Sequence, residues 1–299
     1  MSYTLPRFPK DPETLRQCVD EATRLLGKPL KGHLEVEGRL VQLPAEGEAI
    51  VLGDLHGDIE SLLKVFKETG FLRRVEAEDP ITLICLGDYV DRGPSQVEVI
   101  YTLLRLMLDH PGRVILLRGN HEGPEDIDFS PRDFPQVLRR RFGNEGDFLL
   151  EPFQGLFDRL FTAVRVDGKA LLLHGGIPTG AADLGDIAYA HEHHPGKSYL
   201  SEMLWNDPSP VPGVSPSYRG VGNLFGADIA SGFLERVGCE MLIRGHQSCD
   251  GGFRFSDGPV LTLFSCKLPQ YRNKKGAYLQ IPLDGGFSVD EVRGHIGQF

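Results

Sequence analysis

The chain has 299 residues, 40% of them hydrophobic, which is enough to bury a substantial core. Its formal charge of −10 disfavours general binding to nucleic acid, because that function needs a basic face to neutralise phosphates. No run of residues approaches the roughly 20 apolar residues of a membrane span, and the first ten residues lack the apolar core of a signal peptide. We therefore expect a cytoplasmic protein with no nucleic-acid or membrane partner.

The first predicted element is a helix that begins at the capping pair Asp11 and Pro12 and ends at Gly27. A short hairpin around Gly38 follows it. We expect both to form an N-terminal extension, residues 1–47, of a single catalytic domain that spans residues 1–299. The stretch 179–217 is rich in Gly, Pro and Ser, so we expect it and the first ten residues to be the loosest parts of the chain.

From residue 49, apolar runs typical of buried strands alternate with amphipathic helices. The predicted strands cover 49–52, 81–86 and 114–117, and the predicted helices cover 58–69 and 95–108. This alternation predicts the parallel βαβ units of an α/β fold. After residue 148 the predicted strands become shorter, at 163–166, 170–173, 241–243, 260–264 and 277–281, which indicates a second sheet packed on the first.

The five cysteines are odd in number and show no Cys-x-x-Cys spacing. This pattern favours reduced, buried thiols over a disulfide framework or a zinc-thiolate site.

Polar side chains beside glycines follow most of the predicted strands. These six rim residues are Asp54, His56, Asp88, Asn120, His174 and His246. Because ligands bind beyond the carboxyl ends of strands in open α/β sheets, we expect the six side chains to converge on one rim. Carboxylate, imidazole and amide ligands without a thiolate suit hard or borderline divalent cations, and one central carboxylate, Asp88, can bridge two of them.

Such a pair of cations predicts hydrolysis of a phosphoester by direct attack of a metal-bound hydroxide, without a phosphoenzyme. Arg92 carries a guanidinium suited to bidentate phosphate binding, and Arg219 can close a second clamp. His121, next to Asn120, is placed to act as the general acid that protonates the departing alkoxide. Asp91 is the carboxylate expected to fix its tautomer.

With these motifs in place, the chain resembles the phosphoprotein phosphatase (PPP) family of serine/threonine phosphatases, within the calcineurin-like metallophosphoesterase superfamily. The segments that carry the resemblance are GDLHG at 53, GDYVDRG at 87, GNHE at 119, HGG at 174, LWNDP at 204, RGVGNLFG at 219, RGHQ at 244 and TLFS at 262. The resemblance implies a four-layer α/β/β/α sandwich of two mixed β-sheets flanked by helices.

The same resemblance implies a dinuclear metal site, with manganese expected and iron or zinc as alternatives. One ion would be held by Asp54, His56 and Asp88, and the other by Asp88, Asn120, His174 and His246. The resemblance further implies phosphate contacts from Arg92, Asn120 and Arg219, a general acid His121 paired with Asp91, and phosphoprotein or phosphopeptide substrates.

Two segments depart from the family pattern. After Ser265 the family's Ala-Pro-Asn-Tyr is replaced by Cys-Lys-Leu-Pro, and the nearest tyrosine is Tyr271. After Glu122 the family sequence is lost, and an arginine-rich stretch, 139–141, follows; we interpret it as a helix face and its end. A third feature, the histidine cluster His191, His193 and His194, is interpreted as a solvated polar loop rather than a metal site.

The leading hypothesis is therefore hydrolysis of phosphoserine and phosphothreonine monoesters on proteins, with phosphotyrosine also tolerated. Hydrolysis of diadenosine polyphosphates or other small nucleotides is the alternative within the enzyme class, because such enzymes share GDxHG and GNHE. From a different class, the chain could be a catalytically silent scaffold that binds partners, although every expected ligand and acid is retained.

Overall fold

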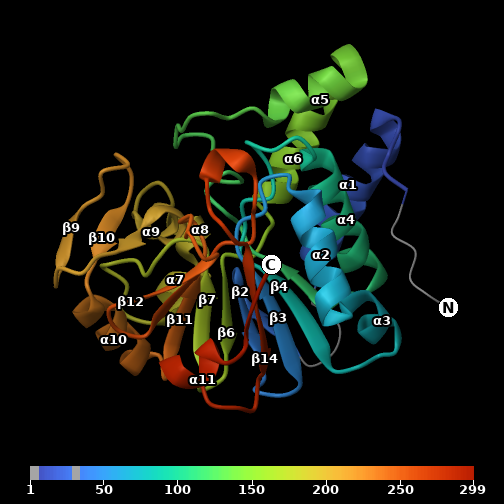
Figure 1. The fold of residues 1–299 in the computed structure, drawn as a ribbon. Coiled ribbons are helices and arrows are strands. Elements are labelled where there is room, and N and C mark those ends of the chain that lie inside the picture. Colours follow the sequence, from blue (N-terminus) through green and yellow to red (C-terminus); the bar gives the residue numbers. More distant parts are fainter. Residues whose placement is uncertain (1–6, 29–33) are drawn as a thin grey trace.

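The computed structural model describes residues 7–28 and 34–299, and its first large element is a five-stranded sheet (Figure 1). The strand order is β15-β14-β3-β4-β5, and the bounds are β3 (Glu48–Leu52), β4 (Ile81–Cys85), β5 (Val114–Leu116), β14 (Ala277–Pro282) and β15 (Ile296–Gln298). β3, β4 and β5 run parallel, whereas β14 is antiparallel to both of its neighbours. The predicted βαβ units are confirmed, with α2 (Ile59–Thr69) and α4 (Gln96–Asp109) as the crossover helices.

A seven-stranded mixed sheet forms the second large layer. Its order is β1-β2-β6-β7-β11-β13-β12, with β1 (Glu35–Glu37), β2 (Leu40–Leu43), β6 (Ala163–Val166), β7 (Ala170–Leu173), β11 (Met241–Arg244), β12 (Phe253–Ser256) and β13 (Val260–Leu263). The predicted hairpin around Gly38 is present as β1 and β2. Because β2 also pairs in parallel with β6, this hairpin is built into the sheet.

The two sheets pack face to face, and helices cover their outer sides, as Figure 1 shows. The strand pleat separates two cores: Leu172 of β7 points to the core between the sheets, whereas its neighbours Leu171 and Leu173 point to the helices outside. The helices beside the five-stranded sheet include α1 (Pro12–Leu26), α2, α3 (Phe71–Glu76) and α4. Those beside the seven-stranded sheet are α7 (Leu184–Ala188), α8 (Ala190–His193), α9 (Tyr199–Trp205) and α10 (Ala227–Arg236). The predicted four-layer sandwich is confirmed.

Local capping explains why the first helices begin and end where the sequence predicts. The Asp11 carboxylate accepts a hydrogen bond from the backbone N–H of Thr14 at 2.8 Å, and Asp58 accepts one from Ser61 at 3.0 Å. Gly70 ends α2 in the left-handed conformation at φ 66°, where a residue without Cβ is favoured.

The remaining helices are α5 (Phe134–Phe142), α6 (Leu150–Phe157), α11 (Val289–Arg293) and the 3₁₀ helices η1 (Gly143–Leu149) and η2 (Pro269–Tyr271).

The region from 179 to 217, expected to be loose, is instead folded. It contains α7, α8, α9 and two strands, β8 (Asp207–Pro208) and β9 (Val214–Pro216), which form a small third sheet with β10 (Asn223–Phe225). The expectation was wrong because apolar residues spaced among the Gly and Pro, such as Ile187, Leu200 and Met203, are fully buried against the outer face of the seven-stranded sheet. The other expected loose part falls partly on residues 1–6, outside the described residues.

The histidine cluster was predicted to lie in a polar loop, which is wrong for His191 and His193, because both lie in the short helix α8. The next residue, His194, pairs with Asp126 at 3.0 Å. The arginines at 139–141 do form the last turn of α5, as predicted.

All five cysteines are free and buried, which confirms the expectation from their spacing. None of the helices in residues 7–28 and 34–299 is long and apolar enough to cross a membrane.

Candidate metal centre

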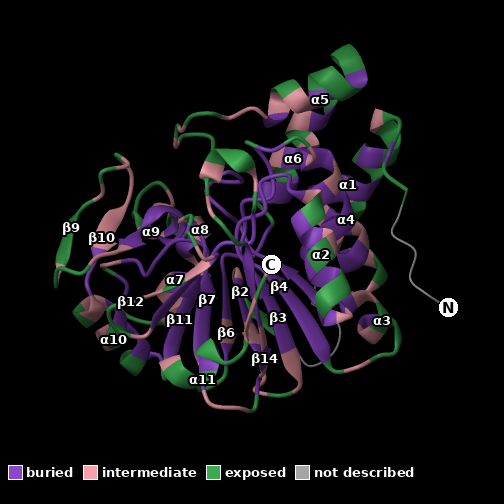
Figure 2. Ribbon diagram, in the orientation of Figure 1, coloured by how far each residue is buried: buried purple, intermediate pink, exposed green. Residues whose placement is uncertain are grey.

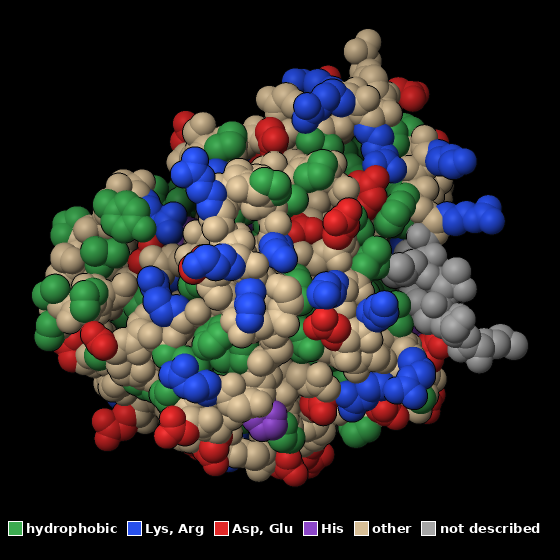
Figure 3. All heavy atoms as spheres, in the orientation of Figure 1, with side chains coloured by type: hydrophobic (Ala, Val, Ile, Leu, Met, Phe, Trp, Pro, Cys, Tyr) green, Lys and Arg blue, Asp and Glu red, His purple; other side chains and the backbone are tan. Residues whose placement is uncertain are grey.

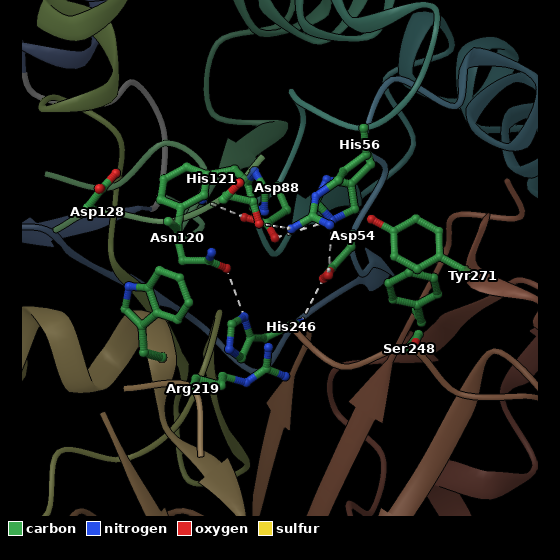
Figure 4. A pocket seen from close by; sticks show the side chains of 15 residues that line it. Asp54, His56, Asp88, Asn120, His121, Asp128, Arg219, His246, Ser248 and Tyr271 are labelled. Atoms are coloured by element: carbon green, nitrogen blue, oxygen red, sulfur yellow. Dashed lines mark hydrogen bonds and ion pairs between the residues drawn. The ribbon is translucent and has the colours of Figure 1, made fainter. Parts of the chain in front are cut away.

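The six rim residues converge where the strands of both sheets end. Asp54 follows β3, Asp88 follows β4 and Asn120 follows β5, while His174 and His246 come from the other sheet, after β7 and β11. An isolated bridge between Asp54 and Phe264 joins the ends of the two sheets at this rim. Figure 2 shows that burial extends from the strands into these loops, and Figure 4 shows the side chains around one cavity. All six rim residues are buried.

Asp88 lies at the centre of the cluster, between His56 and His174. One of its oxygens is 3.4 Å from Nε2 of His56, and the other is 3.5 Å from Nε2 of His174. Oδ2 of Asp54 is 3.7 Å from the same His56 nitrogen. On the far side, Oδ1 of Asn120 is 3.0 Å from Nε2 of His174 and 2.8 Å from Nδ1 of His246.

Two sets of side chains have the spacing needed to hold a metal ion, and both include Asp88. They are His56, Asp88 and His121, and Asp88, His174 and His246, with the ligand atoms of each set within 4.8 Å of one another. The first set differs from the expected one, because His121 stands where Asp54 was predicted. Among residues 7–28 and 34–299, no group forms a hydrogen bond with the buried Nε2 of His246, so the lone pair of this nitrogen is unused there. The donor types and this orphaned nitrogen fit divalent cations.

The electrostatics of the rim favour added positive charge. Burial raises the pKa of Asp54 to about 7 and raises the pKa of Asp88 well above its ordinary value, with the neighbouring carboxylates of Asp54 and Glu122 adding to the effect. Burial also lowers the pKa values of the histidines at the rim, His56, His174 and His246. At neutral pH these imidazoles are therefore uncharged, beside carboxyl groups that are costly to ionise without a counter-charge.

Backbone carbonyls orient two of the imidazoles. Nδ1 of His56 donates to the carbonyl of Val90 at 3.0 Å, and Nδ1 of His174 donates to the carbonyl of Leu86 at 2.9 Å. These bonds fix the tautomer, which leaves Nε2 of each ring with its lone pair toward Asp88.

Glu122 holds the loop that carries Asp88. Its fully buried carboxylate accepts hydrogen bonds from the backbone N–H groups of Asp88 and Tyr89 at 2.8 Å, Gly119 at 3.1 Å and Val90 at 3.3 Å. Burial raises the pKa of Glu122 to about 7. One side chain therefore organises the backbone on which both Asp88 and Asn120 are mounted.

Backbone strain concentrates at the rim. Of the seven non-glycine residues with positive φ in the described part of the chain, five belong to the predicted site, namely His56, Asp88, Asp91, Arg92 and His246. Such conformations persist only where the surrounding structure over-determines them. Gly119 permits the close approach here, because a Cβ on it would press on both the backbone and the carboxylate of Asp88.

The predicted acid pair is assembled beside the rim. Nδ1 of His121 is 2.7 Å from Oδ2 of Asp91, and both side chains are buried. The other Asp91 oxygen accepts the backbone N–H groups of Asp133 and Phe134, each at 2.7 Å. The Asp91 carboxylate is thus fixed on both sides, and the His121 ring is held with Nε2 facing away from Asp91.

The two predicted arginines line the same cavity, of about 320 Å³. Nε of Arg219 donates to Oδ2 of Asp207 at 2.7 Å. Asp207 is fully buried and accepts a second bond, at 2.9 Å, from the buried Arg244. This chain of charges aligns Arg219 toward the rim. The cavity is lined by Asp54, His56, Asp88, Arg92, Asn120, His121, Asp128, Phe129, Ser130, Trp205, Arg219, His246, Ser248, Phe264 and Tyr271.

Several of these residues carry no role in the interpretation of the sequence. Tyr271 reaches the cavity from η2 and stacks on His56, with ring centroids 5.5 Å apart, so a tyrosine stands beside the site although the segment after Ser265 is altered. Phe129, from the divergent segment after Glu122, packs against His121 in a T-shaped arrangement with the ring centroids 4.5 Å apart. Two supporting residues outside the cavity lining, Glu122 and Arg244, belong to the motifs GNHE and RGHQ, but neither has a role in the interpretation of the sequence. Nothing in the sequence pointed to Phe129.

Comparisons with known proteins agree with this geometry. Residues 49–250, which include all six rim residues, match the calcineurin-like phosphoesterase family. A solved structure of a protein serine/threonine phosphatase from Saccharomyces cerevisiae has a TM-score of 0.79 at 24% identity, covering 97% of this chain and 90% of that chain. That likeness bears on the fold alone.

Curated relatives carry phosphatase names. A probable serine/threonine-protein phosphatase of Encephalitozoon cuniculi is 35% identical over 259 residues, which cover 85% of this chain and 54% of that protein. Serine/threonine-protein phosphatase 5 of Arabidopsis thaliana is 33% identical over 254 residues, covering 80% and 44%. The chain thus spans about half the length of these relatives. The family match and the rim together lead to one conclusion: this chain belongs to the calcineurin-like phosphoesterase family.

Proposed function

We propose that this protein is a metal-dependent phosphoprotein phosphatase that hydrolyses phosphoserine and phosphothreonine monoesters, with phosphotyrosine also accepted. The observation that carries the proposal is the buried His121–Asp91 pair beside the Asp88 cluster, in a cavity that two arginines also line. The names of the curated relatives support the choice of phosphoproteins as substrates. The cytoplasm is the proposed compartment.

In this proposal Asp54, His56 and Asp88 hold one divalent cation, and Asp88, Asn120, His174 and His246 hold the second, with manganese as the expected metal. The cations, when bound, supply charge neutralisation and water activation. Arg92 and Arg219 bind the non-bridging phosphate oxygens, and the Asn120 amide adds a further contact.

The protein's own proton chemistry rests on His121. Asp91 accepts the Nδ1 proton, so Nε2 is the nitrogen that gives its proton to the departing serine or threonine oxygen. Burial, together with Arg92 and Arg132, lowers the pKa of His121 in the free protein. A phosphate dianion in the cavity acts in the opposite direction, because a nearby negative charge favours the imidazolium.

The net charge of −10 is not spread evenly over the surface. Figure 3 shows Lys and Arg side chains across the middle of one face, with some acidic ones among them, and several acidic side chains along its lower edge. At the cavity itself the positive charge comes from Arg92 and Arg219, and local charge of this kind attracts a phosphate group to an otherwise acidic protein.

The test compares kcat/KM for a phosphoserine peptide, a phosphotyrosine peptide and diadenosine tetraphosphate, with manganese present. We expect the phosphoserine peptide to be preferred. A large preference for the dinucleotide would replace the proposal with a small-nucleotide hydrolase. Absence of turnover even with p-nitrophenyl phosphate would replace it with a silent scaffold. Asp147→Ala is the matched control, because Asp147 is exposed in η1, which follows α5, and its ion pair within the described residues is with Arg139 on the surface.

A further inference from the structure

We propose that Asp133 is a positioning residue for Arg92, acting through the backbone of the Asp91–Arg92 turn. The inference rests on the proposed function, in which Arg92 binds the substrate phosphate. Asp133 lies in the segment after Glu122 where the chain departs from the family pattern.

The Asp91–Arg92 turn needs outside support. Both residues adopt the left-handed conformation, with φ of 62° and 77°. Two consecutive non-glycine residues are costly in this region, so contacts from elsewhere must stabilise them. The turn also has to aim two neighbouring side chains in fixed directions, the Asp91 carboxylate at His121 and the Arg92 guanidinium at the cavity.

Asp133 and the turn form a reciprocal set of hydrogen bonds. Oδ1 of Asp133 accepts the backbone N–H of Arg92 at 3.0 Å, and its own backbone N–H donates to Oδ1 of Asp91 at 2.7 Å. The same Asp133 oxygen accepts from Nε2 of Gln96 at 3.0 Å, and that Gln96 nitrogen also donates to the carbonyl of Gly93 at 2.9 Å. Asp133 therefore joins the turn to the beginnings of both α4 and α5.

The two arginines of the cavity are held in different ways. Arg219 has a buried carboxylate partner, Asp207, on its own guanidinium. Within residues 7–28 and 34–299, no carboxylate pairs with the Arg92 guanidinium, whose own contact is a 3.4 Å bond to the carbonyl of Ser130. The direction of the Arg92 side chain thus depends on its backbone, and Asp133 is the side chain that holds the N–H of that backbone.

A double-mutant cycle tests this dependence on the manganese-loaded protein, with the inhibition constant for inorganic phosphate as the measurement. We expect Asp133→Ala to raise this constant about tenfold, and to change it less than about twofold when Arg92→Ala is already present. Asp147→Ala is the control for loosened packing of α5 and should match the wild type. Equal factors in both backgrounds would overturn the inference, because a merely structural role is additive.

Two conservative variants keep the test decisive if Asp133→Ala does not fold. Asp133→Asn retains an acceptor oxygen at the same distance from the backbone and should keep phosphate inhibition within about twofold of the wild type. Asp133→Glu retains the charge but moves the acceptor by one methylene, and should weaken inhibition. The reverse order would contradict the inference. If Arg92→Ala leaves phosphate inhibition unchanged, the role of Arg92 in the proposed function fails instead, and the inference falls with it.

Discussion

His121 and Asp91 are joined by a 2.7 Å contact between Nδ1 and Oδ2, and the second oxygen of Asp91 is occupied by two backbone N–H groups. The imidazole is therefore held in one orientation, with Nδ1 bound to Asp91, and in the proposed function Nε2 is the nitrogen that serves the substrate. A histidine used only for packing would not need a partner carboxylate that is itself bound on both sides.

Replacing His121 by Asn tests this role directly. The variant should retain its metal, which would separate His121 from the ligand set that it could form with His56 and Asp88. It should lose kcat by roughly 10²–10⁴-fold, because a general acid contributes that much when the leaving group is poor. The loss should shrink for p-nitrophenyl phosphate, whose leaving group needs little protonation. Steady-state kinetics over a series of aryl phosphates measures the effect, and an unchanged rate with poor leaving groups would remove the assigned role.

Asp88→Asn should lose metal at both positions, since Asp88 belongs to both possible ligand sets. Elemental analysis of the variant, purified beside the wild type, measures the metal content. Two retained ions per chain would refute the bridging assignment.

The affinity for manganese should depend on pH in a window set by the carboxyl groups. The pKa of Asp54 is raised from 3.8 to about 7, and that of Asp88 is raised as well, so protons compete with the metal below about pH 7. We expect affinity to fall about tenfold per pH unit for each proton displaced. Calorimetric titration between pH 5.5 and 8 in buffers of different ionisation enthalpy would count these protons, and a flat profile would contradict the expectation.

Without metal, the raised pKa of Asp54 should make its contribution to folding stability fall as pH rises, whereas the affinity for manganese rises with pH. The native state keeps a proton on Asp54 that the unfolded chain releases above about pH 4, so the contribution of Asp54 to stability is lost as pH rises from about 4 to about 7. The rim histidines His56, His174 and His246 contribute in the opposite direction, because they stay uncharged in the native state while the unfolded chain protonates them.

Urea unfolding in the presence of a chelator should therefore be compared between the wild type and Asp54→Asn: the difference in the free energy of unfolding, wild type minus variant, should fall as pH rises through this range. A difference that grows with pH would show that the Asp54 carboxyl group is ionised in the native state.

Glu122→Gln should destabilise the protein although the two side chains have nearly the same shape. Glu122 accepts four backbone N–H groups through two oxygens, and a glutamine would place an NH₂ donor against some of them. We expect a loss of about 1–3 kcal/mol in the free energy of unfolding. Urea unfolding of the metal-free protein measures it, and a neutral result would mean that the loop is held by other contacts.

The sequence predicted the layers and the rim well because both follow from short-range patterns. Strand ends such as those before Asp54 and Asp88 are marked by an apolar run, a glycine and a polar residue, and each was found in place. The stretch 179–217 was misjudged because Gly and Pro counted for more than the apolar residues that bury it against a sheet.

The contacts that support the site could not be predicted from the sequence, for a different reason. Asp133 meets Arg92 across 41 positions of sequence, and the signal it leaves is that of an ordinary residue before a helix. Tyr271 likewise reaches His56 only because η2 turns it toward the rim. Long-range pairings of this kind leave no periodicity in the chain.

The most direct measurement is anomalous scattering from crystals loaded with manganese. Two peaks should flank the Asp88 carboxylate, with His56 beside one and His174, His246 and Asn120 beside the other, at the roughly 3.5–4 Å separation of paired catalytic metals. Peaks elsewhere, or none at all while the protein hydrolyses phosphopeptides, would contradict a mechanism built on two cations that share Asp88.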